Sequence, residues 1–341
     1  MTLSHVFFRA DATQSIGVGH VMRCLALAQY IAKQGIACHL LTTNPSHIVV
    51  QRWLDCGFSV HNLGELDVGS VADSGATLTA INEFGSAAKH NECILIADHY
   101  DFELDYFRAL RTAGFKLGIF DDLADRPMSA DWVINQNPGA EQQFDYTLMA
   151  PTTELLGAQY VVLRDGIKGE KSAGGRGLLI TMGGADLKNL GLKALQGLLA
   201  KGAGFPIHLV CSAPEFGYNE AVEFAQNYDH VQVSSLGNIE KLMVHADLAL
   251  CAGGVTALEL AHLGVGSVIV ILADNQRAGA LALQDAGASR ATEDLNCAVD
   301  DAFEIMRDVE LRRNMAMSGR TLIDGKGADR IFKSLVKGFA S

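Results

Sequence analysis

The segment Gly17-Val18-Gly19-His20 combines residues that could bind an anion and move a proton. Its glycines permit a tight backbone turn, and Leu25, Ala28 and Ala32 then follow at helical spacing. We therefore expect His20 at the start of a helix, where backbone N–H groups lack intrahelical partners and can bind an anion. The helix dipole favours a neutral imidazole there. Because a neutral imidazole can take a proton from water, the segment predicts an enzyme that acts on a phosphorylated compound.

Two further glycine pairs follow predicted strands and could hold a diphosphate. Gly183-Gly184 precedes the helical pattern 187–199, and Gly253-Gly254 precedes a helix that carries Glu259. Backbone N–H groups at such helix starts can cradle phosphates, and a carboxylate such as Glu259 can accept two ribose hydroxyls. Alternatively, the glycines form ordinary turns, and Glu259 is solvated or stabilised by the helix dipole. The amides of Asn275-Gln276, after the next strand, could fix a base or a sugar.

Polar residues also follow two predicted strands in the first half of the chain. The triplet Asp98-His99-Tyr100 follows the strand expected at 93–97, and the pair Asp121-Asp122 follows the one expected at 117–120. These side chains could line a ligand site at the carboxyl ends of the strands. The first aspartate of each motif could equally cap a following helix.

Arg23 lies one helical turn after His20 and is open to two interpretations. It could bind substrate, or it could pair with a nearby carboxylate such as Asp11. Asp11, in turn, could orient His20 or simply pair with Arg23.

The elements that must position these residues alternate between short apolar runs and helical patterns, which predicts parallel sheets with helices on both faces. The polar, glycine-rich segment 164–177 separates two halves that each begin with a strand, a glycine turn and a helix. We expect two Rossmann-like α/β domains, 1–165 and 166–325, that face each other across a cleft. The last segment, 326–341, has a helical pattern and could pack back on the first domain. The expected strands are 6–8, 38–42, 93–97, 117–120, 132–134, 178–181, 207–211, 231–233, 248–251 and 267–271.

The composition limits the class of protein. A chain of 341 residues with 49% hydrophobic residues fits two globular domains, and a net charge of −12 argues against a broad nucleic-acid or anionic membrane surface. Seven scattered cysteines without a Cys-x-x-Cys pair argue against a disulfide framework or a zinc site. No apolar run approaches the roughly 20 residues that cross a bilayer. We expect a soluble, cytoplasmic protein that uses no metal or other cofactor. Among oligomeric states, a monomer is favoured.

The run from Arg9-Ala10-Asp11 to Leu25 closely resembles the opening of the UDP-sugar hydrolases of pseudaminic acid biosynthesis, and the resemblance extends from about residue 8 to 287. The opening run is specific, whereas many nucleotide-sugar enzymes share the glycine pairs. Further matching motifs are Asp98-His99-Tyr100, Asp121-Asp122, Leu156-Gly157 with Tyr160 and Arg164, Gly183-Gly184-Ala185-Asp186 with Asn189, Gly237-Asn238, Ala252-Gly253-Gly254 to Glu259, and Asn275-Gln276.

The resemblance implies a GT-B-type architecture, similar to the glycosyltransferase that makes lipid II, with the nucleotide mainly on the C-terminal domain. It implies release of UDP from UDP-2,4-diacetamido-2,4,6-trideoxy-β-L-altropyranose for glycan biosynthesis such as flagellin glycosylation. The family's catalytic histidine falls on His20. The candidate substrate-binding residues are Arg9, Asp11, Gly17, Gly19, Tyr100, Asn275 and Gln276, and the candidate nucleotide-binding residues are Gly183, Gly184, Asn238, Gly253, Gly254, Thr256 and Glu259.

The expected reaction is direct displacement at the anomeric carbon by water, with His20 as general base. The helix starts after the two glycine pairs would stabilise the UDP leaving group in place of a metal. One alternative is a glycosyltransferase that uses the same donor with a sugar or lipid acceptor. Another is a catalytically silent nucleotide-sugar-binding subunit, which the intact Gly17, Gly19 and His20 argue against.

Overall fold

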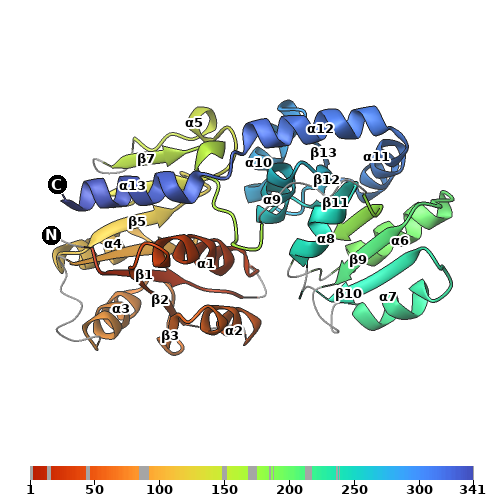
Figure 1. Ribbon diagram of the computed structural model, residues 1–341. Helices are drawn as coiled ribbons and strands as arrows, with labels where there is room; N and C mark the ends of the chain where they lie inside the picture. Colours follow the sequence, from red (N-terminus) through yellow and green to blue (C-terminus); the bar gives the residue numbers. More distant parts are fainter. Residues whose placement is uncertain are drawn as a thin grey trace. The chain divides into compact units, whose positions relative to one another are not determined.

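The chain folds into two units, one formed by residues 1–165 with 325–341 and the other by residues 166–324 (Figure 1). The computed structural model describes residues 3–13, 17–43, 47–83, 92–147, 152–167, 175–183, 186, 188–211, 217–235, 237 and 239–340.

The first unit contains a seven-stranded sheet in the order β3-β2-β1-β4-β5-β6-β7, and all of its strand pairs are parallel. The strand order reverses between β1 and β4, and in open α/β sheets such a switch point is where ligands bind. The strands are β1 (His5–Ala10), β2 (Ala37–Thr42), β3 (Ser59–Asn62), β4 (Cys93–Asp98), β5 (Lys116–Phe120), β6 (Trp132–Asn135) and β7 (Thr153–Leu156).

Helices cover both faces of this sheet. On one face, Val6 and Phe8 of β1 pack with α1, α2 and α13. On the other face, Phe7 packs with α3 and α4, because successive strand side chains point to opposite sides. The helices are α1 (Gly19–Ala32), α2 (His47–Asp55), α3 (Val71–Glu83), α4 (Leu104–Thr112), α5 (Ala140–Gln143) and α13 (Gly327–Ala340), with a 3-10 turn η3 (Ala158–Tyr160).

The C-terminal helix α13 belongs to the first unit although it follows the second in sequence. Its residues Ile331 and Leu335 are fully buried in the same core as α1. Residues 330–339, where the sequence shows a helical pattern, lie within this helix.

The second unit contains a six-stranded parallel sheet in the order β10-β9-β8-β11-β12-β13, with its switch point between β8 and β11. Its strands are β8 (Leu178–Thr181), β9 (Ile207–Cys211), β10 (Val231–Ser235), β11 (Leu248–Ala252), β12 (Gly266–Val270) and β13 (Ser289–Thr292). Its helices are α6 (Leu190–Ala200), α7 (Tyr218–Ala225), α8 (Ile239–His245), α9 (Val255–Leu263), α10 (Asp274–Asp285), α11 (Leu295–Arg307) and α12 (Val309–Leu322).

The predicted fold class, two parallel-sheet α/β domains, is confirmed, and all ten predicted strands are present. The strands β3, β7 and β13, which lie at the edges of the sheets, are not predicted by the sequence. Each has partly exposed residues and lacks the continuous apolar run of a central strand. Among the described residues, no helix combines the length and the hydropathy that a membrane crossing requires.

Candidate active site

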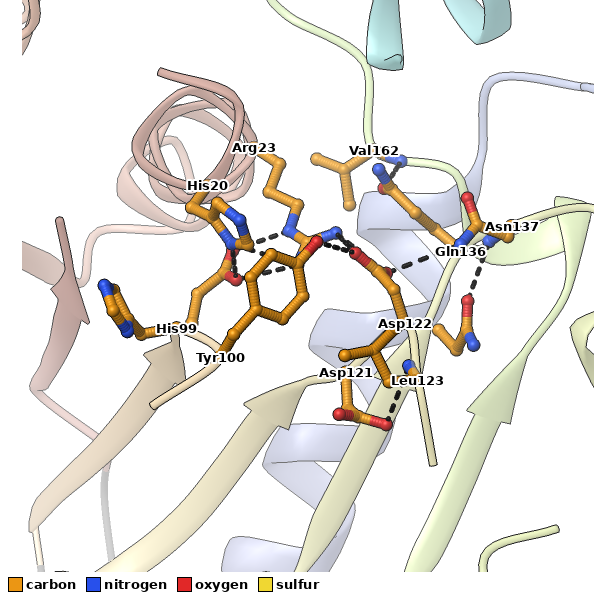
Figure 2. A network of polar contacts seen from close by, with 12 residues as sticks. His20, Arg23, His99, Tyr100, Asp121, Asp122, Leu123, Gln136, Asn137 and Val162 are labelled. Atoms are coloured by element: carbon orange, nitrogen blue, oxygen red, sulfur yellow. Dashed lines mark hydrogen bonds and ion pairs between the residues drawn. The ribbon is translucent and has the colours of Figure 1, made fainter. Parts of the chain in front are cut away.

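The site in the first unit is built around His20 and Asp98. His20 is the second residue of α1, and Asp98 ends β4, next to the switch point of the sheet. The His20 Nδ1 atom lies 2.5 Å from Asp98 Oδ1, and both residues are buried (Figure 2). Because a carboxylate only accepts hydrogen bonds, Nδ1 carries the proton in this pair. The Nε2 atom of the neutral ring is then left as a proton acceptor.

Arg23 connects Asp98 to a second carboxylate. Its Nε and Nη2 atoms donate to the two oxygens of Asp98 at 2.6 and 2.7 Å, and its Nη1 donates to Asp122 at 2.8 and 2.9 Å. Arg23 follows His20 by three residues on α1, so both side chains leave the same face of the helix. The guanidinium also lies 5.0 Å from the centre of the Phe120 ring. Arg23 is thus fixed on three sides.

The ionisation of Asp98 follows from these contacts. Burial by itself would raise its pKa, but the charges of Arg23 and His20 and the hydrogen bonds from both outweigh burial and hold the pKa below its usual range. Asp98 is therefore ionised at neutral pH. The four-residue network of His20, Arg23, Asp98 and Asp122 has two carboxylates and one permanent cation.

Tyr100 covers one edge of this network. Its ring meets that of His20 nearly at right angles, with the centres 4.6 Å apart, and its hydroxyl donates to Asp122 at 3.4 Å. An amide N–H of Asn137 lies 3.5 Å from Asp122. The structure therefore brings Tyr100, one of the candidate substrate-binding residues, directly against the candidate base.

The structure corrects the predicted partners of Asp11. Asp11 bonds neither Arg23 nor His20: it accepts hydrogen bonds from Arg9 at 2.6 Å, and from the Thr42 hydroxyl and the Thr43 N–H at 2.7 Å each. These bonds join the ends of β1 and β2.

Strand geometry explains the correction. In β1, Phe7 and Arg9 point to the face that packs on α3 and α4, and Asp11 continues this alternation just past the strand. In β4, Ile94 and Ile96 point to the α1 face, and Asp98 follows them. The carboxylate that meets α1 therefore comes from β4 and not from β1.

Arg9, at the end of β1, has no exposed surface. Its Nε and Nη2 atoms donate to the two oxygens of Asp73 on α3, at 3.0 and 2.9 Å, and its Nη1 donates to Asp11. In this geometry Arg9 fixes Asp11 and does not present its guanidinium to solvent.

The capping roles considered for Asp98 and Asp121 are also corrected. Asp98 bonds side chains of α1, whereas one oxygen of Asp121 accepts the backbone N–H groups of Leu123 and Ala124 in the loop after β5. Burial raises the pKa of Asp121. Asp121 thus stabilises a turn, as Asp side chains commonly do, and Asp122 reaches Arg23.

The two glycines before His20 differ in conformation. Gly17 has a φ of +72°, in the left-handed region that favours glycine, and its N–H bonds the Thr13 carbonyl at 2.8 Å. Gly19 begins α1 with ordinary helical geometry, and a Cβ there would meet no atom within 4 Å. Gly17 therefore closes the loop, while the space above Gly19 is open.

The second unit places several candidate nucleotide-binding residues near its own switch point. Gly183 follows β8 with a φ of +83°, and Gly253 follows the neighbouring strand β11. A Cβ at Gly253 would lie 3.0 Å from the Cβ of Gln276, so these two motifs are in contact. Gly184 and Asn238 lie outside the described residues.

The remaining candidates lie on the helices that follow β11 and β12. Thr256 is in the first turn of α9, and Glu259 one turn later is completely buried, so its interpretation as a solvated residue is wrong. Asn275 and Gln276 are in the first turn of α10, where the Gln276 side-chain oxygen accepts the N–H of Leu272 at 3.0 Å. Binding of ribose or base by these residues stays a prediction.

In the described part of the chain, no group of three or more His, Cys, Asp or Glu side chains is arranged to hold a metal ion.

The ionic partners of His20 and Arg23 are the residues that sequence reasoning missed. The sequence places Asp98 and Asp122 at strand ends, where they could line a ligand site, but it does not predict their bonds to His20 and Arg23. The alternation of β4, with Asp98 two residues after Ile96, was the signal that could have placed Asp98 on the α1 face.

Comparison with family models finds no match to this chain. Three curated proteins are similar. They are an uncharacterised protein of Methanocaldococcus jannaschii (27% identical over 287 residues, 78% of this chain and 55% of that protein), the spore coat polysaccharide biosynthesis protein SpsG of Bacillus subtilis (24% over 225 residues, 63% and 61%), and the UDP-2,4-diacetamido-2,4,6-trideoxy-β-L-altropyranose hydrolase of Campylobacter jejuni subsp. jejuni (28% over 195 residues, 55% and 63%). The matched regions span between 55 and 63% of the length of these relatives.

Solved structures are similar over nearly the whole chain. MurG of Acinetobacter baumannii has a TM-score of 0.66 at 18% identity, covering 98% of this chain and 99% of that one. UGT2 of Phytolacca americana, in complex with UDP-2-fluoro-glucose and pterostilbene, has a TM-score of 0.69 at 12% identity, covering 99% and 100%. At these identities the likeness shows the fold alone. The fold of this chain is therefore of the GT-B type.

Proposed function

We propose that this protein is a nucleotide-sugar enzyme that hydrolyses a UDP-linked 2,4-diacetamido-2,4,6-trideoxy sugar to the free sugar and UDP. His20 acts as the general base on the attacking water. The observation that carries the proposal is the hydrogen bond between His20 Nδ1 and Asp98, because it fixes the ring and leaves Nε2 to accept a proton.

The charges of the network support this role. Arg23 balances one of the two carboxylates, Asp98 and Asp122, and the other is unbalanced while His20 is neutral. A proton taken from water by His20 balances it. The buried site thus stabilises the imidazolium that forms as water attacks, as a carboxylate partner does for the histidine of a hydrolase triad.

The reaction breaks one bond and forms another at the anomeric carbon. The water oxygen bonds to that carbon, its proton passes to His20 Nε2, and the C–O bond to the UDP leaving group breaks. The start of α9, after Gly254, supplies N–H groups for the diphosphate. The first N–H groups of α6, those of Leu190 and Gly191, already donate to the carboxylate of Asp186 at 2.7 and 2.8 Å and are not available to it. The N-cap residue of α9, Gly254, has no side chain to occupy these groups.

The comparisons support the substrate class. One relative is named as a hydrolase of UDP-2,4-diacetamido-2,4,6-trideoxy-β-L-altropyranose, and a second as a protein of spore coat polysaccharide biosynthesis. Among the structural neighbours, UGT2 binds a UDP-sugar analogue and an epimerase from Neisseria meningitidis binds UDP-GlcNAc. A glycosyltransferase with the same donor is the second candidate, favoured by the GT-B fold.

Release of UDP without an acceptor distinguishes the two candidates. The protein is incubated with a panel of UDP-diacetamido sugars, and the anomeric proton is followed by NMR, which reports the bond broken and the stereochemistry. We expect free sugar and UDP from the wild type, and a rate about 10²- to 10⁴-fold lower for His20→Ala, the usual contribution of a general base. UDP binding should be unchanged in this variant. A wild type that releases UDP only with an added acceptor is a transferase, and full turnover by His20→Ala excludes His20 as the base.

A further inference from the structure

His99 is a second imidazole beside the proposed base, and the mechanism above does not use it. Its ring centre lies 6.4 Å from that of His20, and the residue is 6% exposed. It follows Asp98 in the chain and therefore points to the opposite side of the strand end. Figure 2 shows it directed away from the Arg23 network. On that side its ring lies 5.7 Å from Phe102.

The backbone fixes which nitrogen of His99 carries the proton. The N–H of Asp101 donates to His99 Nδ1 at 3.1 Å, so Nδ1 is an acceptor and the proton of the neutral ring is on Nε2. Arg126 donates to the carbonyl oxygens of His99 and Phe102 and so holds this turn. Within the described chain, Nε2 of His99 has no hydrogen-bond partner.

The ring of His99 is also neutral under ordinary conditions. Burial lowers its pKa, and this effect outweighs the opposing charges of Asp11 and Asp101. The Asp101 carboxylate lies 3.6 Å from Nδ1, beyond hydrogen-bond distance. A neutral imidazole with one fixed donor is suited to bind an oxygen atom, and it does not compete with His20 for the proton of water.

We propose that His99 donates a hydrogen bond from Nε2 to an oxygen atom of the sugar part of the substrate. This rests on the proposed function, in which His20 acts at the anomeric carbon of that sugar. His99 and His20 lie at the same edge of one sheet, and their ring centres are 6.4 Å apart. A single sugar ring can contact two side chains at this separation. His99 then selects for sugars that carry an oxygen atom within hydrogen-bond distance of its Nε2. In this proposal His99 does not contact the diphosphate.

Two substitutions separate donation to substrate from a structural role. In His99→Asn the side-chain oxygen can still accept the Asp101 N–H, as in an Asx turn, but the donor at the Nε2 position is lost. In His99→Gln the amide N–H₂ replaces the Nε2 donor, while the acceptor for Asp101 is lost. Binding is measured by calorimetry in the His20→Ala background, so that the sugar nucleotide stays intact. The probes are UDP alone and UDP-2,4-diacetamido-2,4,6-trideoxy-β-L-altropyranose.

We expect His99→Asn to weaken binding of the sugar nucleotide roughly tenfold, the effect of one lost hydrogen bond, with UDP binding unchanged. His99→Gln should bind within about threefold of the parent, on the same scale. If His99→Asn binds as tightly as the parent, or if only His99→Gln loses affinity, His99 is structural and this inference is wrong, while the proposed hydrolysis is untouched. Thermal unfolding of both variants shows that they are folded. A protein that binds UDP but neither hydrolyses nor binds the diacetamido sugar nucleotide overturns both proposals.

Discussion

Asp98 holds His20 and Arg23 at the same time, with one carboxylate oxygen 2.5 Å from His20 Nδ1 and the other 2.6 Å from Arg23 Nε. The carboxylate is completely buried, so its orientation cannot adjust to solvent. The position of the proposed base is therefore set by a residue 78 positions away in the sequence.

Replacement of that carboxylate should affect turnover more than substrate binding. Asp98→Asn keeps the size of the side chain but removes the charge that stabilises the imidazolium, and its amide can favour the wrong tautomer of His20. We expect kcat to fall by about 10²-fold or more, with little change in UDP affinity. UDP release and UDP titration measure the two effects.

The matched control is Asp105→Asn, an exposed carboxylate on α4 whose partner is Arg108. It should leave kcat unchanged. Equal rates for Asp98→Asn and the wild type would show that Asp98 has no part in the reaction.

Arg23 should be important for stability as well as for activity. Its removal in Arg23→Met leaves Asp98 and Asp122 buried without their cation, and breaking a buried ion pair in this way costs about 3–5 kcal/mol. Urea unfolding measures the loss. Adding Asp122→Asn to Arg23→Met removes one of the two uncompensated charges and should recover part of it.

The control for Arg23 is Arg108→Met, an exposed arginine that pairs with the exposed Asp105. Its effect should stay within about 0.5 kcal/mol. A similar small effect for Arg23→Met would contradict the role of Arg23 as the cation that joins the two carboxylates.

Protonation of His39 should make the stability of the first unit depend on pH. Burial first, and then the neighbouring His5 and His61, lower the pKa of His39 from 6.5 to about 4. Below pH 6.5 the unfolded chain therefore binds a proton at this residue before the folded chain does. The contribution of neutral His39 to the free energy of unfolding should be fully present above pH 6.5. It should fall by roughly 3 kcal/mol as the pH drops towards 4.

His39→Gln should remove this part of the pH dependence of stability, while the variant should still unfold cooperatively above pH 7. Urea unfolding of both proteins at pH 7.5, 6, 5 and 4.5 gives the comparison. Parallel stability curves for the two proteins would mean that His39 is not the titrating group.

The two glycines before His20 should respond differently to alanine. Gly17→Ala forces a Cβ into the left-handed region and should destabilise the protein by about 1–2 kcal/mol. Gly19→Ala should be neutral or stabilise by up to about 1 kcal/mol, because the position is helical and the space around it is open. Thermal and urea unfolding test the pair together, each variant serving as the control of the other. Equal effects would show that the conformation of Gly17 is not the reason for the glycine.

Much of this protein follows from local patterns in its sequence. The apolar run at 6–8, the glycine turn and the helical spacing after His20 place that residue at the start of α1, because each signal depends only on near neighbours. Alternation of such units is enough to predict two parallel-sheet domains. The edge strands β3, β7 and β13 were not predicted, because these partly exposed strands lack a continuous apolar run.

The partners of His20 were decided by the tertiary structure. Asp11 is close in sequence and was the natural candidate, yet it points to the α3 and α4 face with Arg9, whereas Asp98 points to the α1 face. Which carboxylate meets a helix depends on which strands become neighbours and on the side to which alternate residues point. Those two facts arise only when β1 and β4 pair in register and α1 packs on one face of the sheet.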